Sequence, residues 1–288
     1  MPTDQPKNES TYVVDAENAA EMARLMHLDR LITKGMGGLF PEQLEVSSIH
    51  KILDIACGPG GWALDVTHKY PQIQLIGIDI SQLMVEYARA QAKVQWLDNA
   101  SFRVMDARKP LDFPDNSFDL VNARFIAAFM LPSAWPTFLQ ECVRITRPGG
   151  IIRLTECELP ITNGFAGEKL SGMITQAMHL AGQTFSPDGR QLGITPVLGS
   201  LLHAAGVQNI QKKAHVVDFS AGTEAHSSQY QNTMVFFKLI QPFLIKMGIT
   251  TQEEVNGLYQ QALDEMTSDD FCGVWFYLTV RGEVPTKR

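Results

Sequence analysis

Short apolar runs alternate with amphipathic segments from about residue 51 to residue 156. The runs are rich in Ile, Leu and Val, and several end at an acidic residue or a glycine turn, which is typical of buried parallel strands. We expect strands at 51–56, 74–79, 101–105, 118–122 and 150–156, with helices at 61–69, 81–96 and 133–147 between them. This alternation predicts an α/β fold in which helices cover both faces of a parallel sheet.

The pattern changes on either side of this core. A helix from about 16 to 34 begins after Asp15, a good capping residue, and ends at a cluster of glycines. Beyond residue 156 the pattern is looser. It predicts helices near 167–183 and 196–205, two helical pieces within 222–268 that break at Met247-Gly248, and strands near 209–219 and 273–280.

Length and composition fit one large globular domain, with 288 residues of which 45% are hydrophobic. The formal charge of −7 argues against the clustered positive surface that nucleic acids require. The four cysteines form no C-x-x-C pair and no Cys/His ligand spacing, so we expect no metal site. The polar start of the chain shows no signal-peptide pattern, and no apolar run is long enough to span a membrane. We therefore expect a cytoplasmic protein.

The segment Lys51–Leu64 (KILDIACGPGGWAL) joins an apolar run to a helical segment through Gly58, Gly60 and Gly61. Glycines permit backbone angles that other residues avoid, and they leave the backbone open to a ligand. The helix that follows presents unpaired N–H groups and a partial positive charge. A nucleotide-like cofactor is therefore expected on this turn.

The cofactor could be of two kinds. Gly58-x-Gly60-x-x-Ala63 fits the G-x-G-x-x-G/A fingerprint of dinucleotide sites. Asp79 ends the next strand, where a carboxylate can accept hydrogen bonds from ribose hydroxyls. NAD and S-adenosylmethionine (SAM) both carry such a ribose, so these residues leave both cofactors open.

Further features separate the two cofactors. Asp54 is an acid inside an apolar strand, where a charge is costly unless it is paired. Asp106 ends a third strand-like run, and a proline-glycine turn at 147–150 leads into a further strand. The blocks LDIACGPGG, IGIDIS, MDA with FPDNSFDLV, and ITRPGGIIRL follow in this order from Lys51 to about Glu156. In these blocks the chain resembles the class I SAM-dependent methyltransferases of the small-molecule "type 11" group.

The resemblance implies a Rossmann-like, doubly wound sheet of seven strands, mostly parallel, with a C-terminal antiparallel strand. It also implies an N-terminal lid segment at 1–45 and a methyltransferase domain at 46–288. Helical insertions at about 157–195 and 222–268 would then form a cap over the active site. The alternative for the N-terminal helix is plain packing at the edge of the domain.

By the same resemblance the cofactor is SAM. The residues expected to bind it are Asp54, Ala56, Cys57 and Gly58 at the methionine end, Gly60 in the turn, Asp79 on the ribose, Ile80 and Met84 on the adenine, Asp106 and Ala107 at the adenine amino group, and Asn122 near the methyl group. Each of these has an alternative. Asp79 and Asp106 could be ordinary acids at strand ends, Met84 could be a core residue, and Cys57 could only fill space in the turn. Ala56 departs from the family's usual glycine, and alanine permits less backbone freedom.

Tyr12, Arg124 and Phe125 are the candidate acceptor contacts, and Glu156, at the end of the fifth strand, is the candidate general base. Weaker candidates for the base are Glu158, His179, His203 and His226. The stretch from Asn122 to Phe125 lacks the prolines of the Asn-Pro-Pro-aromatic motif that enzymes methylating nucleic-acid bases carry, which argues further against a nucleic-acid substrate.

The sequence thus predicts methyl transfer from SAM to a small, largely apolar metabolite, at oxygen, nitrogen or carbon, for instance in natural-product biosynthesis. Two alternatives stay open: an NAD(P)-dependent oxidoreductase built on the same glycine turn, and a SAM-binding module without catalysis. The expected partner is a small-molecule acceptor, with no nucleic acid and no membrane, and a homo-oligomer is left open.

Overall fold

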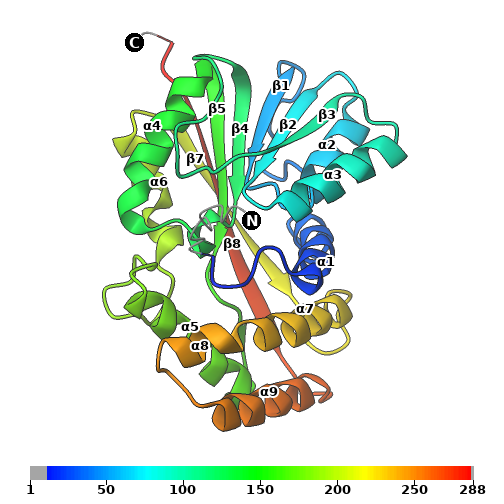
Figure 1. Ribbon diagram of the computed structural model, residues 1–288, viewed down its shortest axis with the longest axis vertical. Helices are drawn as coiled ribbons and strands as arrows, with labels where there is room; N and C mark the ends of the chain where they lie inside the picture. The colour runs from blue at the N-terminus through cyan, green and yellow to red at the C-terminus, as the bar shows by residue number, and fades with distance from the viewer. Residues whose placement is uncertain (1–11, 287–288) are drawn as a thin grey trace, which may run out of the picture.

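The computed structural model describes residues 12–286 of the chain (Figure 1). Residues 1–11 of the predicted lid segment and residues 287–288 of the predicted main domain lie outside the described residues.

An eight-stranded sheet runs in the order β3-β2-β1-β4-β5-β8-β6, and β7 also pairs with β8. The strands are β1 (Lys51–Ile55), β2 (Gln74–Asp79), β3 (Ala100–Val104), β4 (Phe118–Arg124), β5 (Thr146–Cys157), β6 (Ile161–Thr162), β7 (Gln208–Asp218) and β8 (Gly273–Glu283). Strands β1 to β5 are parallel, whereas β8 is antiparallel to β5, β6 and β7.

This topology confirms the predicted α/β fold with a mostly parallel sheet. It differs from the expected seven strands by β6. That two-residue strand forms because the chain, after leaving β5 at Cys157, returns to the same edge of β8 and pairs Ile161 with Val274. The order of the strands reverses between β1 and β4, and ligands of such sheets bind beyond the carboxyl ends at this switch point.

Successive residues of the central strands face opposite layers of helices, as the period of a strand requires. Ile52 packs with apolar residues of α2 (Gly61–Lys69) and α3 (Gln82–Val94) on one face. Leu53 packs with apolar residues of α4 (Trp135–Ile145) and α6 (Ile194–Ala204) on the other. The sheet is therefore covered on both faces by the two apolar clusters of the core.

Four helices form a second layer beyond the carboxyl ends of the parallel strands, and we call them the roof helices (Figure 1). They are α5 (Phe165–Leu180), α7 (His226–Leu239), α8 (Gln241–Lys246) and α9 (Gln252–Met266). The run within 222–268, expected in two pieces, forms three. The additional break lies at Ile240, because Pro242 has no N–H with which to continue the hydrogen bonds of α7.

Helix α1 (Ala19–Gly35) lies beside α7, between the sheet and the roof helices (Figure 1). Its cap is Asn18 and not the expected Asp15: the Asn18 side chain accepts from the N–H of Ala20 at 2.8 Å. Asp15 accepts from the N–H of Glu17 instead, which belongs to the turn before the helix. Two short 3-10 helices, η1 (Ile126–Ala128) and η2 (Pro132–Ala134), follow β4.

A row of polar side chains crosses the buried sheet beneath its carboxyl end. Asp54, Asn122 and Arg153 are in register on β1, β4 and β5. Asn122 Nδ2 donates to Asp54 Oδ1 at 2.7 Å, and Arg153 Nη1 donates to Asn122 Oδ1 at 2.8 Å. Arg153 Nε donates to Glu42 Oε1 at 2.6 Å, from the loop after α1. Each buried charge thus has a partner, without which its burial would be prohibitive.

Replacement of the buried guanidinium tests this row. Arg153→Met is expected to lower the free energy of unfolding by about 3–5 kcal/mol, because Glu42 would stay buried without its counter-charge. Urea unfolding followed by tryptophan fluorescence measures the loss. Lys169→Met is the matched control: Lys169 and Glu254 are 42% and 41% exposed, so losing that pair should cost less than about 1 kcal/mol. Equal losses of unfolding free energy in the two variants would show that the buried Arg153–Glu42 pair matters no more than an exposed pair.

Candidate functional site

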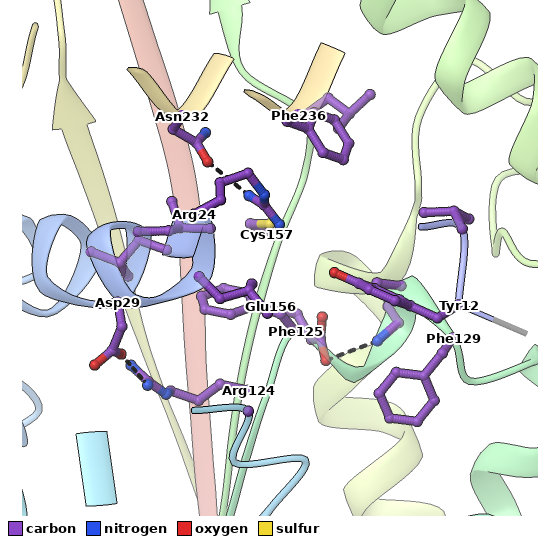
Figure 2. Close-up of a pocket in the computed structure, with 18 of the residues that line it drawn as sticks. Tyr12, Arg24, Asp29, Arg124, Phe125, Phe129, Glu156, Cys157, Asn232 and Phe236 are labelled. Carbon is purple, nitrogen blue, oxygen red and sulfur yellow. Dashed lines mark hydrogen bonds and ion pairs between the residues drawn. The ribbon is translucent and has the colours of Figure 1, made fainter. Parts of the chain in front are cut away.

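A cavity of about 310 Å³ lies at the carboxyl ends of β1, β2, β4 and β5 (Figure 2). The turn between β1 and α2 forms one wall, α1 and the segment before it form a second, and the roof helices α5, α7 and α9 close the far side. The cavity thus occupies the switch point of the sheet, where the order of strands predicts a ligand.

The turn after β1 presents bare backbone to this cavity. Gly58 has a φ of 54°, and a Cβ added to it would meet no atom within 4 Å, so the space beside it is open. Ala56, where the family usually has glycine, is held in the same left-handed region with a φ of 55°. A side chain costs about 1–2 kcal/mol in that region, so the departure seen in the sequence is a point of backbone strain.

Asp79 closes the turn from the end of β2. Its Oδ2 accepts from the N–H of Gly58 at 2.9 Å, and its Oδ1 accepts from the N–H of Ser81 at 2.9 Å. Burial raises the pKa of Asp79, although these N–H donors oppose the rise. The carboxylate lines the cavity and keeps acceptor capacity beyond these two bonds.

Asp106 lies on the same wall with a different partner. Arg108 Nε and Nη2 donate to its two carboxylate oxygens at 2.9 and 3.0 Å. Burial alone would raise the pKa of Asp106, but the hydrogen bonds and charge of Arg108 outweigh it and the pKa is lowered. Asp106 is therefore an ionised acid at neutral pH.

The cavity brings together most of the residues singled out in the sequence. Those lining it are Tyr12, Asp54, Ala56, Cys57, Gly58, Asp79, Ile80, Met84, Asp106, Ala107, Arg124, Phe125 and Glu156. Their position is compatible with the predicted roles, which stay predictions. Burial raises the pKa of the Cys57 thiol, so the thiolate that a nucleophile needs is disfavoured.

Two predicted cofactor residues do not line the cavity. Asn122 is fully buried one layer behind Asp54, since its amide is needed there to join Asp54 to Arg153. Gly60 faces the core: a Cβ on it would come within 2.9 Å of Ala88 and 3.0 Å of Phe102. The Asn122 amide thus lies behind Asp54, and the side of Gly60 that would carry a side chain packs against α3 and β3.

Glu156 lies on the cavity wall at the end of β5 and is 2% exposed. Its Oε1 accepts from the N–H of Ile126 at 2.8 Å and from that of Ala127 at 3.3 Å (Figure 2). Phe125, with a φ of 59°, turns the chain so that η1 points these N–H groups at the carboxyl. Burial raises the pKa of Glu156 to about 8 despite these donors, so the group is mostly neutral at pH 7.

The weaker base candidates are placed elsewhere. Glu158 binds the N–H groups of Leu192 and Gly193 at 2.9 and 3.0 Å. His179 bonds Thr184, His226 bonds the carbonyl of Phe219, and no histidine is among the residues that line this cavity. Glu156 is thus the one base candidate from the sequence that lines the cavity.

A second polar cluster was not predicted from the sequence. Arg24 Nε donates to Glu21 Oε2 at 2.7 Å, and Arg24 Nη1 reaches Asn232 Oδ1 on α7 at 2.7 Å (Figure 2). Tyr12 donates to Glu21 Oε1 at 2.7 Å. The spacing of Glu21 and Arg24 on one helix could have indicated an ion pair. Their burial could not be foreseen, because it comes from α7, far along the chain.

Two kinds of site are not found within residues 12–286. No group of three or more His, Cys, Asp or Glu side chains is arranged to hold a metal ion. None of the helices there combines the length and the hydropathy needed to cross a bilayer.

Comparisons with known proteins match the segment of the chain that carries the glycine turn. A family model described as "Methyltransferase domain" covers residues 52–150, which include the glycine turn, Asp79 and Asp106. The demethylmenaquinone methyltransferase of Thermotoga maritima is 31% identical over 166 residues, which are 56% of this chain and 69% of that enzyme. That of Geobacillus stearothermophilus is 32% identical over 124 residues, 43% of this chain and 52% of that enzyme. The chain thus spans about half the length of several of the curated relatives it matches.

A solved structure extends the likeness to almost the whole fold. The YcgJ protein of Bacillus subtilis has a TM-score of 0.52 and 18% sequence identity, and the match covers 90% of this chain and 98% of that chain. At this identity the likeness concerns the fold alone.

The strained turn gives a stability test. Ala56→Gly is expected to raise the free energy of unfolding by up to about 1 kcal/mol, because relief of the left-handed strain exceeds the added flexibility of the unfolded chain. Gly58→Ala, at nearly the same φ and without a clash, should lower it by about 1 kcal/mol. Urea titrations of both variants measure the two changes. A loss of stability in Ala56→Gly would show that alanine carries no strain at this position.

Proposed function

Because the chain belongs to the class I SAM-dependent methyltransferases, we propose that it transfers a methyl group from SAM to a small, largely apolar metabolite in the cytoplasm. The observation that carries the proposal is a single cavity with two unlike halves. One half has the open glycine turn with Asp54, Asp79 and Asp106. The other half is mainly apolar, with Phe129, Ile174, Met178, Leu192, Phe236 and Phe237 in its lining, and the polar side chains there include the Arg24–Asn232 pair.

The polar half fits the cofactor. The space beside Gly58 is open, so an adenosyl ligand can approach the backbone without meeting a side chain. Asp79 would hold the ribose hydroxyls, and Asp106 the adenine amino group, beside Ile80 and Met84. Arg108 already occupies both oxygens of Asp106, so the adenine amino group would share this carboxylate with the guanidinium. When bound, SAM supplies an electrophilic methyl group.

The apolar half sets the class of acceptor. Its aromatic and aliphatic side chains favour an apolar body, and the enclosure keeps water from the reacting atoms. Several of the curated relatives, among them the two reported above, are named for demethylmenaquinone. We take the reduced form of demethylmenaquinone as the first acceptor to test.

Glu156 would receive the proton of the acceptor. The atom that gains a methyl group must lose its proton, and the deprotonated Glu156 carboxyl, next to the apolar half, can accept it. Its backbone donors from η1 fix the orientation of the carboxyl. Tyr12 and Phe125, which also line the cavity, would contact the acceptor.

Cofactor binding is the first test. Calorimetry with SAM should give saturable binding, and Asp79→Asn should weaken it about tenfold or more, because an amide replaces the acceptor of charge-assisted hydrogen bonds. Asp98→Asn, at an exposed position, is the matched control and should bind as the parent does. A fluorescence titration with NADH should show no saturable binding.

Three outcomes would overturn the proposal. NADH binding tighter than SAM binding would favour the oxidoreductase. Asp79→Asn binding as tightly as the parent would remove the assigned ribose contact. SAM binding without S-adenosylhomocysteine formation, with reduced demethylmenaquinone and a panel of phenols and amines, would favour a binding module without catalysis.

Glu156 is tested by its pH dependence. Folding raises its pKa from 4.5 to about 8, so the stability it contributes is present below pH 4.5 and is lost as the pH rises to about 8. Glu156→Gln should flatten this fall in the free energy of unfolding, measured by urea titration at pH 5, 6.5 and 8. Glu253→Gln, exposed on α9, should leave the fall unchanged.

The catalytic arm uses the same variants. Methyl transfer to reduced demethylmenaquinone by the parent should increase with pH up to about 8, because only the ionised carboxyl accepts a proton. Glu156→Gln should lower kcat by about 10²–10⁴-fold. An unchanged kcat with the predicted effect on stability would leave Glu156 a structural group and refute its role as the base.

A further inference from the structure

Asp29 lines the cofactor half of the cavity, beside Gly61, and one of its carboxylate oxygens has no partner among residues 12–286. One of its oxygens pairs with Arg124, from the end of β4 (Figure 2). The other, Oδ2, is shut off from solvent and has no hydrogen-bond partner among residues 12–286. A buried carboxylate oxygen without a donor is costly, which indicates that a donor is supplied by a ligand.

Gly61 makes room for this oxygen. A Cβ on Gly61 would come within 2.3 Å of Asp29 Oδ2, so no other residue could stand there unless the carboxylate moved away. Because the φ of Gly61 does not lie in the left-handed region, the glycine is not required by the backbone. Gly61 is therefore the residue that permits the close approach of α1 to the glycine turn.

Arg124 completes a charged cluster at this end of the cavity. Its guanidinium stacks on Trp62 and Phe125, at 5.7 and 5.9 Å from their ring centroids, and both it and Asp29 line the cavity. The cluster lies close to Asp54. Burial raises the pKa of Asp54 to about 6, the charge of Arg124 opposes that rise, and the charge of Asp29 adds to it.

We propose that Asp29 and Arg124 form the subsite for the amino-acid end of the cofactor: Asp29 Oδ2 accepts from its α-ammonium group, and the Arg124 guanidinium donates to its α-carboxylate. The inference rests on the proposed function and moves Arg124 from the acceptor to the cofactor. A zwitterion has the two charges that this pair complements. The adenosine end is assigned to Asp79 and Asp106, so the amino-acid end is the part of the ligand left for the charges beside Asp54.

The test compares ligands with and without this end. Calorimetry of the parent, Asp29→Asn and Arg124→Gln uses S-adenosylhomocysteine and 5′-methylthioadenosine, which lacks the amino-acid end. Both variants should bind S-adenosylhomocysteine about tenfold to hundredfold more weakly and bind 5′-methylthioadenosine within twofold of the parent. Asp15→Asn, at an exposed position before α1, is the matched control for Asp29→Asn and should bind both ligands as the parent does.

Decarboxylated SAM separates the two residues, since it keeps the ammonium group and lacks the carboxylate. Asp29→Asn should weaken its binding, whereas Arg124→Gln should leave it within twofold of the parent. Thermal unfolding of each variant shows that it is folded.

The inference is overturned if Asp29→Asn weakens both adenosyl ligands equally or neither. The same holds if Arg124→Gln affects SAM and decarboxylated SAM alike. Failure of the parent to bind either adenosyl ligand would instead refute the proposed function, so the two failures are distinguishable.

Discussion

The burial of the Asp54 carboxyl within the sheet is the constraint on which the site depends. An acid inside an apolar strand is tolerated only with partners, and here they come from the neighbouring strands in register, Asn122 and then Arg153. Arg153 in turn needs Glu42, which lies outside the sheet. The polar floor of the cavity is therefore a chain of hydrogen bonds in which removal of any member leaves another unpaired.

This chain of bonds also positions the N-terminal segment. Glu42 ties the loop after α1 to Arg153, and Asp29 ties α1 itself to Arg124. Arg24 then joins α1 to Asn232 on α7. One helix is thus attached by polar contacts both to the sheet and to the roof helices, with the cavity between them. The lid role predicted for residues 1–45 stays a prediction, and these contacts concern only the described part of that segment, from residue 12 onward.

The parts of the site that follow from local pattern were predictable from the sequence. Asp79 and Asp106 end strand-like runs, and a parallel sheet places such ends side by side. The contacts of Asn122, Asp29 and Glu42 were not predictable, because each joins residues 68 to 111 positions apart, and those of Asp29 and Glu42 depend in addition on how α1 docks. The sequence did indicate a buried ion pair at Arg153, since an arginine within an apolar strand needs a buried partner. Its partner could not be identified from spacing.

The acids of the cavity differ in charge for reasons that suit its two halves. Asp106 is ionised because Arg108 offsets its burial, whereas Glu156 has only backbone donors and stays mostly neutral near pH 7. A neutral carboxyl beside Phe125 and the roof side chains does not oppose the entry of an apolar acceptor, as a fixed charge there would. An ionised carboxyl at Asp106 favours donors such as an amino group. Two carboxyl groups in one cavity thus differ in charge, one suited to a polar ligand group and the other to an apolar one, and the arginine partner makes the difference.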